Sequence, residues 1–285
     1  MGQRNAFGSQ IRYWRNARGR TQLEVAMKSG YSQRHVSFLE SGRARPSREA
    51  VLVMADTLDI PTSARNGLLE AAGFAPLYTH EPLTSARLEG VITALQEILS
   101  SHQPFPAILV DRAWNMFGAN ETAVALFRHF PGTADPGDGT TPTNAIRVCL
   151  DPGGLKPFIR NWDGFIRGML GQLKRELEHN VMHEELSNLI ADIEAAINAT
   201  GSRYTVDTEG NFPVALLELE KGETRVDLYT MMSAFNMPMD ATLAELRIET
   251  FFPANPETRQ FLNDLDEKVR DTEREESRAM TPVRQ

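Results

Sequence analysis

The sequence predicts an α+β protein, in which an all-α domain of five helices is followed by an antiparallel five-stranded sheet covered by helices. Apolar residues recur every three or four positions through most of the first 76 residues, as in short amphipathic helices. Residues 106–119 are predicted to form two short strands that turn near Asp111, strand character with alternating apolar and polar residues returns within 213–252, and helical spacing lies between these two segments. The predicted organisation is a helical domain at 1–76, a linker and connecting helix at 77–101, and a sheet domain at 102–285.

The composition is that of a globular protein of two domains. The chain has 285 residues, of which 41% are hydrophobic and 24% are charged. No apolar run approaches the ~20 residues that span a bilayer, and the N-terminus has no apolar secretory segment. The single cysteine, Cys149, excludes an internal disulfide and is expected to be a buried packing residue. We therefore expect a cytoplasmic protein without a membrane partner.

The first predicted helix runs from Ser9 to Ala17 and ends at Gly19. Ile11 and Trp14 lie at helical spacing and are expected to face the core. Three arginines are expected on the opposite, solvated face: Arg12, Arg15 and Arg18.

A capping-box signature begins the second helix, because Thr21 can cap it and Glu24 follows three residues later. The apolar residues that come next at helical spacing are expected to face the core; they are Leu23, Ala26 and Met27. Gly30 can adopt the left-handed backbone that ends a helix in a tight turn.

Ser32 is expected to cap the third helix, with Val36 and Leu39 pointing inward. Two short helices joined by a glycine turn form a helix-turn-helix, whose second helix reads the major groove of DNA. Glutamine can pair with adenine there, and arginine with guanine. The residues expected to contact bases or phosphates are Gln22, Gln33, Arg34, His35, Ser37, Arg43, Arg45 and Arg48. The alternative is an ordinary helical hairpin with a solvated polar face.

The distribution of charge favours DNA binding over that alternative. Residues 1–48 contain ten Lys and Arg against two acids, a net charge of +8. Because the whole chain carries −8, residues 49–285 carry −16. A basic segment joined to an acidic remainder is typical of a nucleic-acid-binding domain attached to a second domain. Double-stranded DNA is therefore the expected partner.

Two further helices complete the first domain, and a third connects it to the next. Pro46 begins a helix that runs to about Leu58, and Ser63 is expected to cap another that runs to Ala72. A connecting helix is predicted from Leu83 to Ser101. Its apolar stripe consists of Leu88, Val91, Ile92, Leu95, Ile98 and Leu99. This stripe can pair in a dimer or, more simply, pack on its own C-terminal domain.

The sheet domain is expected to open with two strands in 106–119, after which Asn120 caps a helix to Phe130. Residues 131–142 are predicted to form a loop, and 143–198 to be mostly helical with breaks at Asp151 and near Asn180. A polar loop is expected at 200–211.

Three more strands are predicted at 213–220, 224–235 and 243–252. The middle strand is expected to place Val226, Leu228, Thr230, Met232 and Ala234 on one face. On the last strand, Leu246, Ile248, Thr250 and Phe252 form one face, while Glu245, Arg247 and Glu249 form the other. One apolar face of the sheet is expected to be covered by the helices of 143–198.

Specific segments of the chain resemble known families. Residues 8–74 resemble the Cro/repressor-type (XRE) helix-turn-helix family, on the segments IRYWRNARG, TQLEVAMKSGYSQRHVSFLESGRARPS and VLVMADTLDIP. The chain is similar, more narrowly, to regulators with a C-terminal MmyB-like ligand-binding domain, on SQRHVSFLESGRARPSREAVLVMADTLDIPTSARNGLLEAAGFAP and, more diffusely, on NAIRVCLDPGGLKPFIRNW and ATLAELRIETFFPAN. The resemblance implies a transcriptional regulator whose C-terminal domain is PAS-like and binds a small, fatty-acid-like ligand.

The expected ligand site is an apolar pocket between the sheet and its covering helices. Arg147, Arg160 or Asn161 can hold a ligand carboxylate, because guanidinium and amide groups donate to its two oxygens. The residues expected to contact ligand are Arg147, Asn161, Trp162, Phe165, Ile166, Met169, Leu228 and Met232. Methionine and aromatic residues at helical spacing are also typical of an ordinary core.

No catalytic motif is found. The chain has no Walker A sequence, no GxGxxG and no Gly-x-Ser-x-Gly. His179 and His183 have the spacing of zinc ligands on a helix, but HNVMH lacks the glutamate of HExxH, so a solvated helix face is favoured. We therefore expect no enzyme activity, no metal site and no cofactor, apart from a bound fatty acid or similar apolar ligand.

The resulting hypothesis is a ligand-responsive bacterial transcriptional regulator that binds a two-fold symmetric operator as a homodimer. Ligand would shift the population of DNA-binding states through the connecting helix. One alternative is a C-terminal domain that serves only dimerisation or partner binding. The other is a helix-turn-helix fused to a metal-dependent enzyme, which would hold zinc.

Overall fold

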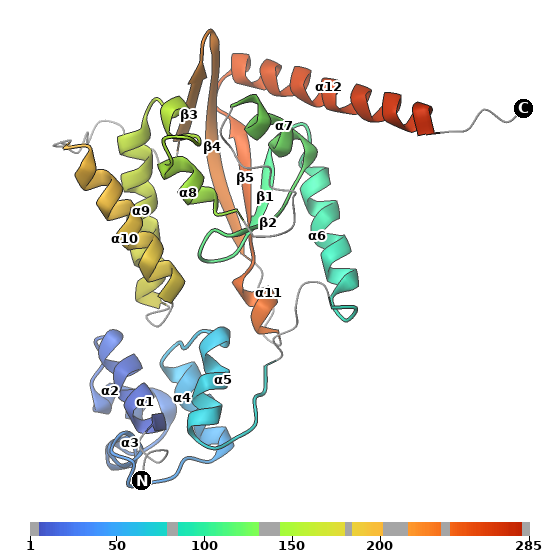
Figure 1. The fold of residues 1–285 in the computed structure, drawn as a ribbon. Coiled ribbons are helices and arrows are strands. Elements are labelled where there is room, and N and C mark those ends of the chain that lie inside the picture. Colours follow the sequence, from blue (N-terminus) through green and yellow to red (C-terminus); the bar gives the residue numbers. More distant parts are fainter. Residues whose placement is uncertain are drawn as a thin grey trace, which may run out of the picture. The chain divides into compact units, whose positions relative to one another are not determined.

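The computed structural model describes residues 6–78, 85–130, 143–179, 184–201, 216–234 and 240–280. The chain divides into two compact units. The first consists of Met1–Ser85, Leu173–Ser187 and Phe235–Glu245, and the second of Ala86–Gln172, Asn188–Ala234 and Leu246–Gln285. The five N-terminal helices (the helical domain) lie in the first unit, and all five strands (the basis of the sheet domain) lie in the second. The predicted α+β class is confirmed (Figure 1).

Five helices form the helical domain, as predicted. They are α1 (Ala6–Ala17), α2 (Gln22–Ser29), α3 (Gln33–Glu40), α4 (Arg48–Thr57) and α5 (Thr62–Ala71). Ile11 and Trp14 of α1 are buried, as are Val36 and Leu39 of α3, and these residues share one core with apolar residues of α2, α4 and α5. The predicted inward faces of α1 and α3 are therefore confirmed.

The predicted inward face of α2 is wrong in part. Leu23 and Met27 are 52% and 77% exposed, whereas Val25 and Ala26 are buried. The helix has only 8 residues and carries apolar side chains on two faces. Its spacing therefore admits two orientations, and packing against α3 and α4 selects the one that buries Val25.

The start of α5 also differs from the prediction. The helix begins at Thr62, its N-cap residue is Pro61, and no side chain caps it, so Ser63 lies within the first turn. After α5, the side chain of Asn66 holds the departing chain. Its Oδ1 accepts hydrogen bonds from the backbone N–H groups of Leu77 and Tyr78 at 3.0 Å each.

The five strands form one antiparallel sheet, as predicted. They are β1 (Ala107–Val110), β2 (Met116–Ala119), β3 (Leu216–Lys221), β4 (Thr224–Ala234) and β5 (Arg247–Pro253). Their order in the sheet is β2-β1-β5-β4-β3, so the last strand of the chain lies at its centre. In this register Glu249 of β5 lies opposite Ile108 of β1 and Met232 of β4.

The N-terminal part of the last predicted strand is helical instead. Residues Ala241–Glu245 form the short helix α11, and β5 begins only at Arg247. Asp240 caps this helix, because its Oδ1 accepts a hydrogen bond from the N–H of Leu243 at 3.0 Å. An aspartate before a short helix is a local signal for the start of that helix. The alternation of apolar and polar residues that follows it favours a strand, and the prediction followed the alternation.

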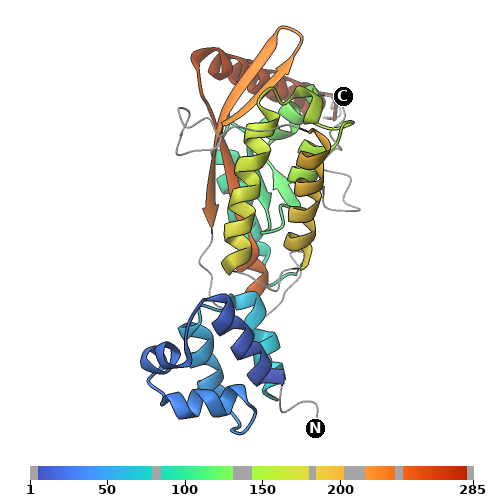
Figure 2. The same ribbon diagram turned by 90° about the vertical axis from the view of Figure 1, so that its left-hand side faces the viewer.

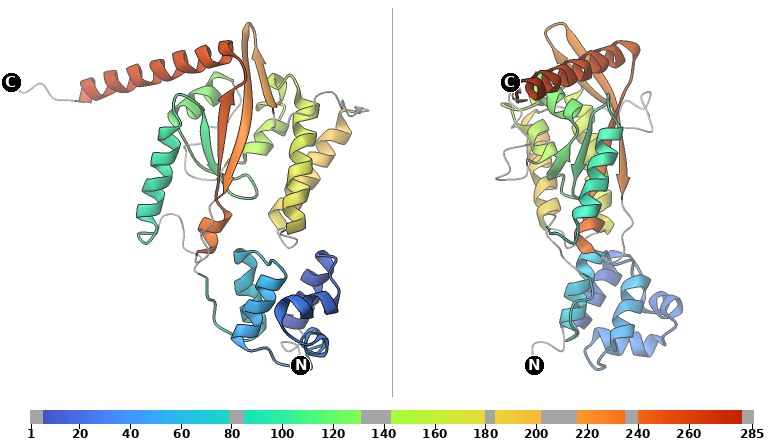
Figure 3. Two further views of the ribbon diagram at one scale, coloured as in Figure 1. Left: turned by 180° about the vertical axis from the view of Figure 1, so that it is seen from behind. Right: turned by 90° about the vertical axis from the view of Figure 1, so that its right-hand side faces the viewer.

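Helices cover both faces of the sheet rather than one. On one side lie α6 (Glu89–Ser101) and α12 (Pro256–Met280), and on the other lie α8 (Ala145–Leu150), a short 3₁₀ helix (Lys156–Phe158), α9 (Trp162–His179) and α10 (Glu184–Ala199). The helix α7 (Glu121–His129) contacts α12, and the ring of Phe130 after it lies 5.6 Å from that of Phe158 in the 3₁₀ helix. The two opposite side views separate these layers (Figures 2 and 3). The helices of 143–198 thus cover the face of β5 that carries Glu249, not the face of Ile248.

The connecting helix packs on the sheet domain, which confirms the simpler of its two predicted roles. Leu95 and Leu99 of α6 are buried, while Ile98 is 47% exposed. Asn120, the predicted cap of α7, is buried at the same place and donates hydrogen bonds from its amide nitrogen to the carbonyls of Leu99 and Phe105. The amide of Asn120 therefore ties α6 to the start of α7.

The predicted loops at 131–142 and 200–211 lie wholly or almost wholly outside the described residues, and so does the predicted break near Asn180. Among the helices of the described ranges, none is long and apolar enough to cross a membrane.

Candidate nucleic-acid interface and ligand cavity

Local capping fixes the geometry of α2, the turn and α3. Thr21 Oγ1 accepts from the N–H of Glu24 at 3.2 Å, and Thr21 N–H donates to the Glu24 carboxylate at 2.7 Å, which is the predicted capping box. The hydrogen bonds that the backbone N–H and the hydroxyl of Thr21 donate to the Glu24 carboxylate lower the pKa of Glu24. Gly30 has a φ of 76°, in the left-handed region, and Ser32 caps α3 by accepting from the N–H of His35. The chain therefore forms the helix-turn-helix that the sequence predicts.

The N-terminal half of α3 presents polar side chains to solvent. Gln33 and Arg34 are exposed, and Ser37 is half-buried one turn later. His35 is half-buried, with its ring against that of Tyr31 at a centroid distance of 5.0 Å. Exposed glutamine and arginine at the start of the second helix are the groups that reach base edges in this motif.

Two predicted DNA-contacting arginines lie on one aromatic ring. The guanidinium carbon of Arg34 lies 5.2 Å from the centre of the Phe38 ring, and that of Arg43 lies 5.9 Å from it. Cation–π contacts of this kind contribute about 0.5–1 kcal/mol of stabilisation at exposed sites, which restrains the arginine side chains. Phe38 therefore orients Arg34 on α3 and Arg43 on the following segment. Arg45 is exposed nearby in sequence, and Arg48 is half-buried as the first residue of α4.

Gln22 and two of the arginines assigned to the surface surround a buried acid. Glu40 is 1% exposed and forms an ion pair with Arg15, whose Nε lies 2.6 Å from its Oε1. Gln22 donates from its amide nitrogen to Glu40 Oε2 at 2.8 Å, and Arg12 Nε lies 3.7 Å from the same oxygen. The outward orientation predicted for Arg15 is therefore wrong, because its side chain is only 14% exposed.

Two more basic residues join α1 to the end of α4. Arg18 donates to the carbonyls of Leu58 and Asp59, and it is half-buried rather than fully outward as predicted. Arg20 donates to the carbonyl of Thr57 and to the carboxylate of Asp59. Part of the basic charge of residues 1–48 thus stabilises the domain itself, so the charge available to DNA is concentrated on α2, α3 and the segment after α3.

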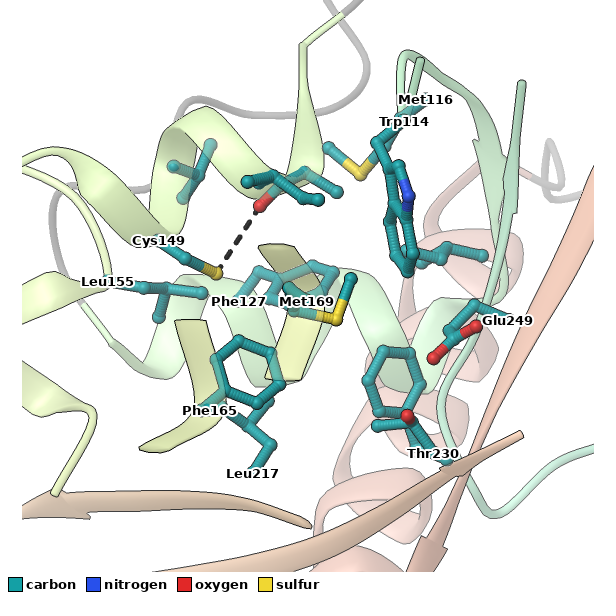
Figure 4. Close-up of a pocket in the computed structure, with 15 residues that line it drawn as sticks. Trp114, Met116, Phe127, Cys149, Leu155, Phe165, Met169, Leu217, Thr230 and Glu249 are labelled. Carbon is teal, nitrogen blue, oxygen red and sulfur yellow. Dashed lines mark hydrogen bonds between the residues drawn. The ribbon is translucent and has the colours of Figure 1, made fainter. Parts of the chain in front are cut away.

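A cavity lies in the sheet domain between the sheet and the helices α8 and α9. The space within it that atoms do not fill is about 650 Å³, with its open mouth included. Its lining is Ile108, Trp114, Met116, Phe127, Ala145, Ile146, Val148, Cys149, Leu155, Phe165, Met169, Leu217, Thr230, Glu249 and Phe251. Figure 4 shows Glu249 and Thr230 together at one side, with Cys149 and Leu155 across from them.

Glu249 is the one acidic or basic side chain among these lining residues. It is 4% exposed, and this burial raises its pKa to about 7, although a hydrogen bond from Thr230 acts in the opposite direction. Its Oε2 has no hydrogen-bond partner among the described residues. A buried carboxylate oxygen without a partner is costly, and in a cavity it is available to a ligand.

Trp114 lines the cavity with a strained backbone. Its φ is 67°, a region that bulky residues rarely occupy, at a cost of about 1–3 kcal/mol. Hydrogen bonds around the β1–β2 turn hold it there: its N–H donates to the carbonyl of Asp111, and Asn144 donates to the carbonyl of Ala113. Strain of this kind is concentrated at functional sites, which supports a role for the cavity.

Only two of the eight residues predicted to contact ligand, Phe165 and Met169, line the cavity. Trp162 is buried with its Nε1 donating to the carbonyl of Cys149 at 2.7 Å. The other three apolar predictions also lie off the lining: Ile166 and Leu228 are fully buried, and Met232 is 36% exposed.

The three polar candidates for a ligand carboxylate are engaged elsewhere. Arg147 forms an ion pair with Asp192 at 2.8 Å, and Arg160 forms one with Glu218 at 2.8 Å. Asn161 donates to the carbonyl of Leu216 and accepts from the N–H of Glu218, so it joins the start of α9 to β3. None of the three is among the lining residues of the cavity.

Sequence reasoning missed Glu249 and Thr230. Glu249 lies in the alternating segment RIETFF, where a glutamate indicates a solvated face. That face is buried only because α8 and α9 cover it, and no local signal records this. Trp114 was also missed, since its conformation depends on the turn.

Cys149 is buried, as predicted, and the histidine pair lies only partly within the described residues. Burial raises the pKa of Cys149 to about 12, and its Sγ donates to the carbonyl of Ala145, so the thiol is inert at neutral pH. His183 lies outside the described residues. Within the described ranges, no group of three or more His, Cys, Asp or Glu side chains is placed to hold a metal ion.

Comparisons with known proteins agree with these two sites. Residues 11–64 match the helix-turn-helix family, and residues 91–265 match the MmyB-like transcription regulator ligand binding domain. Among solved structures, the clp gene regulator ClgR from C. glutamicum is 29% identical over 26% of this chain and 91% of its own, with a TM-score of 0.23. No curated protein sequence matches the chain. Since the second match covers more than half of the chain, the protein belongs to the family of transcription regulators with an MmyB-like ligand-binding domain.

Proposed function

We propose that the protein binds operator DNA with the exposed face of α3 and that a small apolar ligand in the sheet-domain cavity changes this binding. The observation that carries the proposal is the apolar cavity of about 650 Å³ in the same chain as a capped helix-turn-helix with Gln33 and Arg34 exposed. The hydrocarbon chain of a fatty-acid-like ligand suits such a lining. The five-stranded antiparallel sheet supports the PAS-like assignment of this domain.

The proposal extends to a homodimer in the cytoplasm of a bacterium. Helix-turn-helix proteins of this type commonly bind two half-sites that are related by two-fold symmetry. The helix α6 ends against the sheet domain through Leu99 and Asn120, so a change in the cavity can alter its position. Ligand would then shift the population of DNA-binding states, as far as its affinities for those states differ.

Two arginine variants test the DNA interface. Arg34→Ala is expected to relax base preference at one position of the operator, because Arg34 lies on the exposed start of α3. The expected loss of discrimination between bases is about 1–3 kcal/mol. Arg43→Ala is expected to weaken binding to all sequences alike and to lower the salt slope by about 1, as the loss of a phosphate contact does. Anisotropy titrations on a selected operator and on its single-base variants, at several salt concentrations, measure both effects.

Arg225→Ala is the matched control, since Arg225 is an exposed arginine of the sheet domain that pairs with Glu220. It should leave affinity and salt slope unchanged. Loss of both base preference and general affinity in both test variants would show that α3 is not the recognition helix.

Native mass spectrometry before and after organic extraction tests the ligand. We expect dimers that carry an extractable mass of a few hundred daltons, the mass of a small apolar ligand. The extracted compound, added back, should change operator affinity. Dimers without an adduct, together with no binding from a panel of fatty acids, fatty amines and fatty alcohols, would instead favour a C-terminal domain that serves only assembly. Zinc in elemental analysis would favour an enzyme.

A further inference from the structure

We propose that Glu249 and Thr230 form the polar anchor of the cavity, and that this anchor selects apolar ligands with a hydrogen-bond-donating head group, an amine or an alcohol, over ligands with a carboxylate. The inference rests on the proposed function and deepens it, because it assigns the chemistry of the head group at the same site.

The anchor is built by two adjacent strands. Glu249 lies opposite Met232, and Thr230 lies opposite Phe251, so Glu249 and Thr230 are diagonal neighbours on the same face of β5 and β4. The hydroxyl of Thr230 donates to the Glu249 carboxylate. Oε2 of Glu249 then has no donor among the described residues, and the close-up shows the carboxylate facing the cavity (Figure 4). A ligand donor placed in the cavity would complete this hydrogen-bonding site.

The charges around the anchor disfavour a ligand carboxylate. Among the described residues that line the cavity there is no lysine, arginine or histidine, and the thiol of Cys149, their other titratable group, stays neutral. Arg247 lies on the same face of β5 two residues earlier, but it donates to the carbonyl of Leu246 and is not a lining residue. A carboxylate head group would therefore meet Glu249 without a cation, and two such carboxyl groups can bind together only by sharing a proton.

Head groups that donate hydrogen bonds, such as amines and alcohols, are favoured beside Glu249. An ammonium group forms a charge-assisted hydrogen bond with Oε2 and favours the ionised form of Glu249. An alcohol donates to the same oxygen without adding charge. A fatty acid is expected to bind mainly in its neutral, protonated form, so its affinity should fall as the pH rises from about 6 to about 8.

The test uses the full-length protein and three probes of equal chain length: decylamine, 1-decanol and decanoic acid. Isothermal titration calorimetry at about pH 8, below the micelle concentration of each probe, is expected to show the amine and the alcohol binding at least about tenfold more tightly than the acid. In Glu249→Gln the affinity for the amine should fall. The affinity for the acid should rise, because a neutral amide can donate a hydrogen bond to a carboxylate. Glu223→Gln, an exposed acid in the β3–β4 turn, is the control and should keep the native order.

Thr230→Val provides a second variant of similar shape. Loss of its hydroxyl removes a hydrogen bond that favours the ionised carboxylate, so the preference for amine over acid should fall, though less than in Glu249→Gln. Equal affinities for 1-decanol and decanoic acid in the native chain, or an unchanged order in Glu249→Gln, would overturn the anchor and leave the proposed function intact. If none of the three probes binds, the anchor and the apolar-ligand function both fail.

Discussion

Glu40→Ala is expected to destabilise the helical domain by about 3 kcal/mol or more. The carboxylate is 1% exposed, pairs with Arg15 at 2.6 Å and accepts from Gln22 at 2.8 Å. Removing one partner of a buried ion pair costs about 3–5 kcal/mol, because the other charge stays buried without compensation. For a domain of this size, 3 kcal/mol lowers the melting temperature by more than about 10 °C.

Hydrogen exchange followed by mass spectrometry of the full-length chain measures this effect separately for peptides of α1–α5. Glu70→Ala is the matched control, since Glu70 is an exposed acid on α5 and its removal should change stability by less than about 0.5 kcal/mol. A loss of the same size in both variants would show that the ion pair at Glu40 contributes little. Operator affinity of Glu40→Ala should fall in parallel, because the same group holds α1 against α3.

Glu249→Gln is expected to change the pH dependence of stability of the sheet domain. The ordinary pKa of a glutamate is 4.5, and burial raises that of Glu249 to about 7 in the folded protein. The folded state therefore binds this proton more tightly than the unfolded state. The resulting stabilisation is fully present below pH 4.5 and is lost as the pH rises to about 7, a total of roughly 3 kcal/mol.

Glutamine does not titrate. The free energy of unfolding of the variant, relative to that of the native chain, should therefore rise by roughly 3 kcal/mol between about pH 4.5 and pH 8. Urea denaturation followed by tryptophan fluorescence measures this difference. A Trp14→Phe background removes the tryptophan of the helical domain and leaves Trp114 and Trp162 as reporters of the sheet domain. Glu223→Gln should show no such gain. Parallel pH profiles for the native chain and Glu249→Gln would mean that the folded carboxyl keeps its ordinary pKa.

Local signals in the sequence were sufficient for the elements and for the DNA-reading motif. The capping box at Thr21, the left-handed Gly30 and the caps at Ser32 and Asn120 each act over three or four residues, and all four are confirmed. The five strands were also predicted, and on β4 and β5 the alternation within the strand reports its two faces. Prediction was wrong at the start of β5, where a cap at Asp240 and the following alternation compete within a few residues.

The candidate ligand site depended on tertiary structure. Side chains assigned to ligand from sequence, such as Arg147 and Asn161, pair with acids or with backbone of other elements. The buried carboxylates Glu40 and Glu249 have polar partners that are distant in the chain or on another strand.

The sequence by itself determined which segments form helices, strands and turns over most of the described chain, and it determined the helix-turn-helix with its exposed Gln33 and Arg34. Only the tertiary structure decided which face of α2 is buried, which arginines are held by Glu40, and that Glu249 lies in a cavity. Periodicity along a segment shows that two faces differ, but burial depends on what packs against each face. Here helices cover both faces of the sheet, so a glutamate that alternates like a surface residue becomes the polar group of an apolar site.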